Sequence, residues 1–322
     1  MTATNLPPEA AAFLNEWLGS DWETSALEGD ASVRQYFRLA AGKDRYMLAY
    51  YPEVVREGVS RFVASYRAIE RFVSVPAVVR HSVAAVVQAD VGDETLFDLL
   101  YREPDRAIPL YREAIGLLIR FQRSEETAAS LNPAFTSRSF RQELEMTRDF
   151  YLEQLLESPQ ADSVQLRSLM DELCEKIASH PYVLCHRDYH GQNIHLFNQR
   201  LYMIDYQDMR MGPDTYDLAS LLRDRGVARV IGVANEDALV NYYAQELGAE
   251  SSGVRERYFE TLLQRSIKIL GTFAKQAIVR NKQHYLEFIP PTLESIARCL
   301  DHLEEFEGFR RFFPIRADAT HK

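Results

Sequence analysis

The chain of 322 residues carries a formal net charge of -10, with 46% hydrophobic and 26% charged residues. The composition is that of a globular protein, and the acidic excess argues against nucleic acid as a partner, because nonspecific nucleic-acid binding needs a basic surface. The longest apolar runs are far shorter than the roughly 20 residues of a membrane span, so we expect no membrane association. The first residues lack a signal-peptide pattern, and three widely spaced cysteines give no disulfide framework. We therefore expect a cytoplasmic protein.

The first 90 residues predict a small sheet accompanied by two helices. Strands are indicated where apolar and polar side chains alternate, and the stretch AAGKD supplies a turn between two of them. Helices are indicated where apolar residues recur every three or four positions. The expected elements are a helix at 6–20, strands at 32–39 and 45–52, a helix at 53–72, and two strands within 75–90.

After Gly92 the pattern becomes mainly helical, with one short β segment in the middle. The expected elements are helices at 107–123, 138–157 and 163–179, a strand, loop and hairpin at 182–205, and a helical series from 216 onward. This order predicts an α+β protein with two domains, a β-rich one at 1–92 and a helical one at 93–322. A ligand site is expected in the cleft between them.

Three polar residues of the β segment VLCHRDYHGQNIHLFNQRLYMIDYQD (183–208) stand at the ends of apolar runs. A hairpin that turns at Asn198 and Gln199 would return Asp205 to Asn193. Unpaired acids beside apolar strands are costly unless something binds them, and carboxylate and amide oxygens suit a magnesium ion that carries phosphates. We therefore expect Asn193 and Asp205 to bind Mg²⁺, and Asp188 to accept a proton from a substrate hydroxyl.

These residues also carry a resemblance to known enzymes. HRDYHGQN, followed after a hairpin by IDYQD, resembles the catalytic and metal-binding loops of the protein-kinase-like superfamily. The ending IDYQD and the following GPDTYDLASLL resemble the aminoglycoside phosphotransferase and choline kinase branch. DASVRQYFRL, HRDYHGQN, IDYQDMRMGPDTYDLASLLRD and QRSIKILGTFAK further resemble bacterial anomeric kinases of N-acetylmuramate and N-acetylglucosamine, and these segments are spread over most of the chain.

The resemblance implies a two-lobed kinase-like fold, ATP and Mg²⁺ as cofactors, and an amino sugar as the small-molecule acceptor, phosphorylated at its anomeric hydroxyl in cell-wall sugar salvage. In this family Asp188 would be the catalytic base, His186 would support the loop, and Asp217 would brace it from the next helix. Gln88 to Gly92 would form the hinge between the lobes. The residues expected to contact ATP are Ser32, Arg34, Gln88 and Asp90.

One departure from the superfamily concerns the lysine that grips the α- and β-phosphates. The strand RYMLAYY has Leu48 or Ala49 at that position, and Lys43 is out of register. Arg34 and Arg38 would supply the missing charge, since a guanidinium binds phosphate oxygens in a bidentate way. The missing lysine keeps a second hypothesis open, a nucleotide-binding pseudokinase that scaffolds a partner.

The acceptor also stays open between an amino sugar and others such as an aminoglycoside or choline. A row of acids in the helical part would suit a polycation, namely Glu143, Glu145, Asp149 and Glu153. An amino sugar with a carboxylated lactyl group would instead call for an arginine, and Arg141 or Arg148 would serve. The sequence leaves the oligomeric state open, and a monomer is compatible with it.

Overall fold

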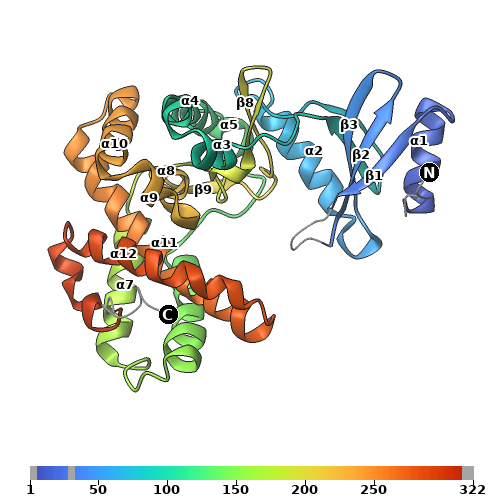
Figure 1. The fold of residues 1–322 in the computed structure, drawn as a ribbon. Helices are drawn as coiled ribbons and strands as arrows, with labels where there is room; N and C mark the ends of the chain where they lie inside the picture. Colours follow the sequence, from blue (N-terminus) through green and yellow to red (C-terminus); the bar gives the residue numbers. More distant parts are fainter. Residues whose placement is uncertain (1–5, 28–32, 314–322) are drawn as a thin grey trace.

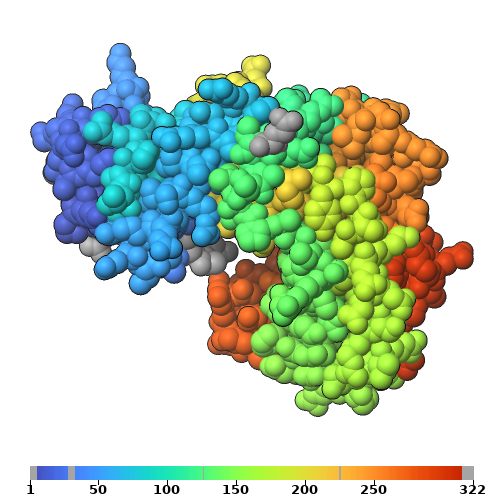
Figure 2. All heavy atoms as spheres, turned by 180° about the vertical axis from the view of Figure 1, so that it is seen from behind, coloured from blue at the N-terminus to red at the C-terminus, as the bar shows by residue number. Residues whose placement is uncertain are grey.

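The computed structural model describes residues 6–27 and 33–313, which form two parts with different secondary structure (Figure 1). The amino-terminal part is a small antiparallel sheet flanked by helices, and the carboxy-terminal part is largely helical. In the view from behind, the amino-terminal part (blue) lies on one side of the molecule and the red carboxy-terminal segment on the other (Figure 2). The α+β architecture predicted from the sequence is confirmed.

The amino-terminal part packs apolar side chains on both faces of its sheet. Its elements are α1 (Pro8–Leu18), β1 (Glu23–Leu27), β2 (Gln35–Ala41), β3 (Asp44–Tyr50), the 3-10 turn η1 (Glu53–Val55), α2 (Gly58–Ile69), β4 (Val78–His81) and β5 (Ala85–Ala89). The strand order is β1-β2-β3-β5-β4, with all neighbours antiparallel. Leu39 and Leu48 pack with Leu14 of α1, whereas Ala49 belongs to the buried cluster that contains Phe62 of α2. The sheet is therefore held between α1 and α2 (Figure 1).

Strand β1 is absent from the sequence prediction. It lies at the edge of the sheet, and four of its five residues are exposed. Such a strand needs no alternation of apolar and polar residues, because neither of its faces is buried. Its position is fixed instead by antiparallel pairing with β2, in which Ala26 is opposite Phe37.

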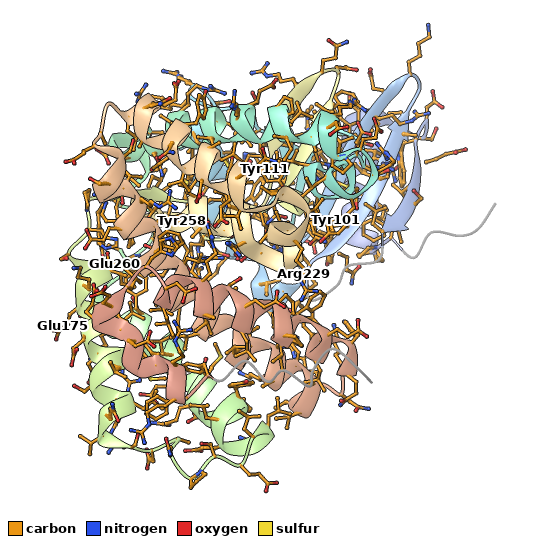
Figure 3. The ribbon with its side chains drawn as sticks, turned by 60° about the vertical axis from the view of Figure 1, so that its left-hand side comes forward. Tyr101, Tyr111, Glu175, Arg229, Tyr258 and Glu260 are labelled. Carbon is orange, nitrogen blue, oxygen red and sulfur yellow. The ribbon has the colours of Figure 1, made fainter. Side chains whose placement is uncertain are left out.

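The carboxy-terminal part is arranged around the long helix α11. Its helices are α3 (Leu96–Arg102), α4 (Pro104–Gln122), α5 (Glu125–Ala128), α6 (Ser137–Met146), the π-helix η2 (Thr147–Leu155), α7 (Val164–Ala178), α8 (Tyr216–Arg223), η4 (Asp224–Gly226), α9 (Val227–Ile231), α10 (Val233–Leu247), α11 (Ser251–Val279), η5 (Gln283–Phe288), α12 (Ile289–Leu300) and η6 (Glu304–Arg311). Tyr111 of α4 and Tyr258 of α11 are fully buried in the shared core (Figure 3). Across the described residues, no helix is both long and apolar enough to cross a membrane.

The helix predicted at 138–157 changes type in the middle because α11 approaches it closely. An added Cβ at Gly271 would lie 2.6 Å from the carbonyl carbon of Met146 and 2.7 Å from the Cα of Thr147. Thr147 is the first residue of the π-helix, and its hydroxyl donates to the carbonyl of Ile267 at 2.5 Å. Backbone contact between the two helices therefore coincides with the transition, and it requires glycine at position 271.

Candidate active site

Four short strands hold the loop that carries Asp188. They are β6 (Tyr182–Cys185), β7 (Ile194–Phe197), β8 (Arg200–Met203) and β9 (Arg210–Pro213), and the 3-10 turn η3 (Gly191–Asn193) precedes β7. Strands β7 and β8 form the predicted hairpin, with Asn198 and Gln199 both at positive φ in its turn. Strand β6 pairs with β9, which the sequence analysis does not predict. We call residues 186–193, between these two strand pairs, the catalytic loop.

Asp217, at the start of α8, anchors the beginning of the catalytic loop. Its fully buried carboxylate accepts the backbone N–H of His186 at 2.6 Å and that of Arg187 at 2.9 Å. Burial raises the pKa of the Asp217 carboxyl, while the His186 side chain and the two N–H groups act in the opposite direction. Arg187 needs this support, because its φ of 81° lies in the left-handed region that costs a non-glycine residue energy.

Asn193 and Asp205 are brought together by backbone pairing. The N–H of Ile204 donates to the carbonyl of Asn193 at 3.0 Å, which places Asp205 beside Asn193. The side-chain amide of Asn193 donates to the carbonyl of Asp188 at 2.8 Å, so its oxygen remains for another ligand. Asp205 has a φ of 62° and accepts a hydrogen bond from Gln207 at 2.9 Å. His186 connects the two segments, since its Nε2 lies 2.8 Å from the carbonyl of Ile204.

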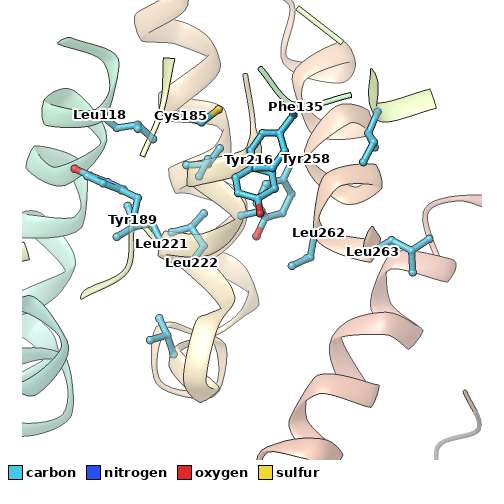
Figure 4. Packing of buried hydrophobic residues seen from close by; sticks show 14 of the residues in the cluster. Leu118, Phe135, Cys185, Tyr189, Tyr216, Leu221, Leu222, Tyr258, Leu262 and Leu263 are labelled. Atoms are coloured by element: carbon cyan, nitrogen blue, oxygen red, sulfur yellow. The ribbon is translucent and has the colours of Figure 1, made fainter. Parts of the chain in front are cut away.

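Asp188 is exposed and is surrounded by positive charge. The next residue, Tyr189, is buried and donates to the carbonyl of Ala114 on α4 at 2.7 Å, which fixes the middle of the loop (Figure 4). The neighbouring basic side chains are His186, Arg265, Lys268 and Arg187. Desolvation opposes ionisation of Asp188, but these basic groups outweigh it and hold the pKa of the carboxyl below its usual range. Asp188 is therefore ionised at neutral pH.

A cavity of about 330 Å³ lies between the sheet and the β7–β8 hairpin, and we call it the interlobe cavity. Asn193 and Asp205 line it on the helical side. The remaining lining comes mainly from the sheet and the segment after β5, including Arg34, Gln88 and Asp90. Five residues singled out from the sequence therefore share one cavity. Ser32, the other residue expected to contact ATP, lies outside the described residues.

Arg34 lies in the bend just before β2 and faces the helical side of the interlobe cavity. Its Nη2 lies 3.5 Å from Oδ1 of Asp205, and its guanidinium lies over the rings of Tyr36 and Tyr51 at 5.7 and 5.8 Å. Ala49, at one of the two positions where the superfamily lysine is expected, is buried and also lines the cavity. A small side chain at this position leaves space that Arg34, from the bend before β2, reaches.

Arg38 has a different environment from Arg34. Its guanidinium is paired with Asp90 at 2.7 Å and with Asp93 at 2.6 Å. Asp90 also accepts the backbone N–H of Gly92 at 2.9 Å, and Gly92 O lies 2.8 Å from Nδ1 of His195. Arg38 therefore ties β2 to the segment after β5 and does not line the interlobe cavity, contrary to the expectation that it faces phosphates.

The arginines expected near an acceptor carboxylate are also placed elsewhere. Arg141 pairs with Asp171 at 2.7 Å and with Glu145, and Arg148 pairs with Asp149 at 2.6 Å and with Glu145. Both are thus already neutralised on the α6–η2 segment. The sequence analysis instead overlooks Arg187, although it stands inside the HRD motif next to Asp188.

Comparison with solved structures defines the class of protein. The chain is similar to the structure of the gentamicin–APH(2")-IIa complex, with 17% identity, coverage of 91% of this chain and 98% of that chain, and a TM-score of 0.61. Plasmodium vivax ethanolamine kinase gives 12% identity, coverage of 93% and 87%, and a TM-score of 0.61. These likenesses confirm the two-lobed, protein-kinase-like fold.

Sequence comparison then gives the family. Residues 23–258 match the Phosphotransferase enzyme family (APH), and the chain belongs to this family, which makes it a phosphotransferase. It is 29% identical over 286 residues to the N-acetylmuramate/N-acetylglucosamine kinase of Pseudomonas aeruginosa, with coverage of 83% of this chain and 81% of the relative. It is 24% identical over 302 residues to the protein of the same name from Neisseria meningitidis, with coverage of 88% and 89%.

Proposed function

We propose that this chain transfers the γ-phosphoryl group of ATP, with Mg²⁺, to the anomeric hydroxyl of an N-acetylated amino sugar. The observation that carries the proposal is the connection of Asp188 to the Asn193 and Asp205 pair at the interlobe cavity. The names of the curated relatives support the choice of acceptor. By the same reasoning the protein would be cytoplasmic and would return cell-wall sugars to metabolism as sugar 1-phosphates.

The donor set at the cavity suits Mg²⁺. Asp205 supplies a half-exposed carboxylate, and Asn193 supplies a neutral oxygen whose partner nitrogen is already hydrogen-bonded. Mg²⁺ prefers such hard oxygen ligands and takes further ones from water and phosphate. Bound there, the ion would neutralise negative charge on the phosphates of ATP. Arg34, whose guanidinium lies 3.5 Å from the Asp205 carboxylate, would add a protein cation beside the same phosphates.

Asp188 would act on the acceptor. An ionised carboxylate next to the metal ligands can accept a hydrogen bond from a sugar hydroxyl, orient it, and take its proton as the new bond forms. In phosphoryl transfer of this kind, most of the rate enhancement comes from positioning and charge stabilisation. The hydrogen bonds from Asp217 and Asn193 to the loop would provide that positioning.

The domain boundary would lie at residue 92, with residues 1–92 as the nucleotide-binding lobe and 93–322 as the catalytic and acceptor-binding lobe. Gln88 and Asp90 line the interlobe cavity at the join. The Asp90 carboxylate is occupied by Arg38 and by the N–H of Gly92, so it would shape the hinge rather than contact adenine directly. Adenine would then be recognised by backbone groups of this segment.

A polycationic acceptor is the less favoured candidate, because the acids that would attract it are already paired. Glu143 binds Lys268 at 2.9 Å, and Glu145, Asp149 and Glu153 all lie within ion-pair distance of Arg148. The intact set of Asp188, Asn193 and Asp205 also favours an active enzyme over a pseudokinase.

Phosphorus NMR of the reaction products tests the proposal. Purified protein would be incubated with ATP and Mg²⁺ and, in separate reactions, N-acetylglucosamine, N-acetylmuramate, choline and an aminoglycoside. We expect an anomeric phosphate signal with the amino sugars, and none with Asp188→Asn protein or when EDTA is added. Transfer to choline or the aminoglycoside alone would replace the amino sugar as acceptor. Tight ATP binding without transfer to any acceptor would favour the pseudokinase.

A further inference from the structure

Arg187, the residue before Asp188, lies close to Arg210, and neither has a carboxylate partner among the residues that the structure describes. Arg187 belongs to the catalytic loop, and Arg210 begins β9, where it is paired in register with Cys185 of β6. Within residues 6–27 and 33–313, no carboxylate oxygen lies within 4.0 Å of either guanidinium, and Nε of each is buried without a hydrogen-bond partner. Buried polar groups are normally hydrogen-bonded, and two neighbouring guanidinium groups without an acidic partner are suited to bind an anion.

The two guanidinium groups are held over the same aromatic ring. The Cζ atoms of Arg187 and Arg210 lie 5.8 and 5.3 Å from the centroid of Phe135. The Phe135 ring stacks on Phe140 at 4.8 Å. It also packs against Tyr216 at 5.0 Å (Figure 4). The Phe135 ring is therefore held by packing against its neighbours, and both guanidinium groups lie over this one ring.

Strand β9 packs closely against the Phe135 ring. The N–H of Phe135 donates to the carbonyl of Met211 at 2.8 Å. An added Cβ at Gly212 would lie 2.7 Å from the Phe135 ring, so glycine is required for the ring to approach the strand. From the other side, the buried Arg265 donates to the carbonyl of Arg187 at 3.4 Å.

Like charges this close repel each other, and the structure offers them only partial relief. Burial and the charge of Arg187 lower the pKa of Arg210, whereas Asp208, Glu143 and Tyr216 raise it. Of these, Glu143 is committed to Lys268. A bound anion would convert the repulsion into two charge-assisted, bidentate contacts.

We propose that Arg187 and Arg210 form a subsite for a carboxylate on the acceptor, which makes them specificity-determining residues for acidic amino sugars. The proposal rests on the function proposed above. Neither arginine lines the interlobe cavity, where we place the nucleotide, which favours the acceptor as the source of the anion. Arg187 directly precedes Asp188, which puts the subsite next to the hydroxyl that reacts. An acceptor with both a reactive hydroxyl and a nearby carboxylate would be held at two points.

Matched acceptors isolate the carboxylate. N-acetylmuramate, its lactyl methyl ester and N-acetylglucosamine share the sugar ring. The ester lacks only the negative charge, whereas N-acetylglucosamine lacks the whole lactyl group. We expect the wild-type protein to favour the free acid over the ester in kcat/KM. In Arg210→Gln this ratio falls by at least about tenfold, the scale of losing a charge-assisted contact. Arg210→Lys keeps the charge but cannot bind a carboxylate in a bidentate way, so it lowers the acid-to-ester ratio less. Arg167→Gln removes an exposed arginine of α7, and the ratio stays at the wild-type value.

Three results would overturn the subsite. One is an acid-to-ester ratio that neither Arg210 variant changes. Another is an equal loss on all three sugars with a raised KM for ATP, which would place Arg210 on the nucleotide. If Arg210→Gln does not fold, as judged by its thermal transition, the acid-to-ester ratio of Arg210→Lys decides.

If the wild type phosphorylates none of the sugars, the proposed function fails, and calorimetry with the free acid and its ester decides the subsite. The subsite is supported if the wild type binds the free acid more tightly than its ester and Arg210→Gln loses this preference. Equal binding of the two sugars, or no binding of either, overturns it.

Discussion

Replacing Arg34 by alanine tests whether this arginine takes the role of the missing lysine. Its Nη2 lies 3.5 Å from Oδ1 of Asp205, both residues line the interlobe cavity, and the Arg34 side chain is 21% exposed. Two charges near a protein surface interact by about 4 kcal/mol at 4 Å, but hydration offsets much of this. A net contact with phosphate is worth about 1.5–3 kcal/mol, which corresponds to a loss of about ten- to a hundredfold in kcat/KM for ATP. Steady-state kinetics with varied ATP and saturating acceptor measure this loss.

Arg38 and Lys43 provide the comparison for this experiment. Arg38→Ala breaks the pairs with Asp90 and Asp93 at the hinge, so we expect a smaller rise in the KM for ATP. Lys43 lies exposed in the turn between β2 and β3, and its replacement by alanine has almost no effect. A large effect at Lys43 or Arg38 with none at Arg34 would refute the reasoning, because the phosphates would then lie on another face of the sheet.

Four further predictions concern the loop and the core. Asp188→Asn keeps the fold and most ATP affinity but lowers kcat by about 100-fold or more, and unchanged turnover would remove it as the base. Asp205→Ala abolishes Mg²⁺-dependent ATP binding in calorimetry, since Asn193 alone brings no negative charge. Asp217→Asn turns an NH₂ group toward a backbone N–H, which lowers the free energy of unfolding in urea by about 1–3 kcal/mol and also lowers kcat. Gly271→Ala overpacks the contact with η2 and lowers stability by about 1–3 kcal/mol, whereas Gly253→Ala on the same helix has room for its methyl group and costs little.

The parts of the site that are local in sequence could be predicted. Asn193 and Asp205 are joined by one short hairpin, and the turn residues Asn198 and Gln199 fix its register. Local turn chemistry thus suffices to bring the two side chains together. The helices with a clear apolar stripe, such as α4, are likewise present where the periodicity predicts them.

The parts that depend on distant residues could not be predicted. Arg34 and Arg38 look equivalent in the sequence, but distant acids distinguish them. Arg38 pairs with Asp90 and Asp93, more than 50 positions away, whereas Arg34 lies beside Asp205. Strand β9 has no alternating pattern and exists because β6 lies beside it. The β1 edge strand and the π-helix depend in the same way on neighbours that no local pattern reveals.

The geometry of the catalytic loop is maintained by hydrogen bonds that offset an unfavourable backbone. Arg187 and Asp205 both adopt the left-handed backbone conformation, which costs a non-glycine residue about 1–3 kcal/mol. Asp217 holds Arg187 in place by accepting the backbone N–H groups of His186 and Arg187. The His186 side chain ties the loop to Ile204, the residue before Asp205. Because Asp217 and His186 are fully buried, water does not compete for these bonds. The interactions that stabilise the strained backbone are thus the ones that set the spacing between Asp188 and Asp205, so a change that relaxes the strain would also separate the proposed base from the proposed metal ligand.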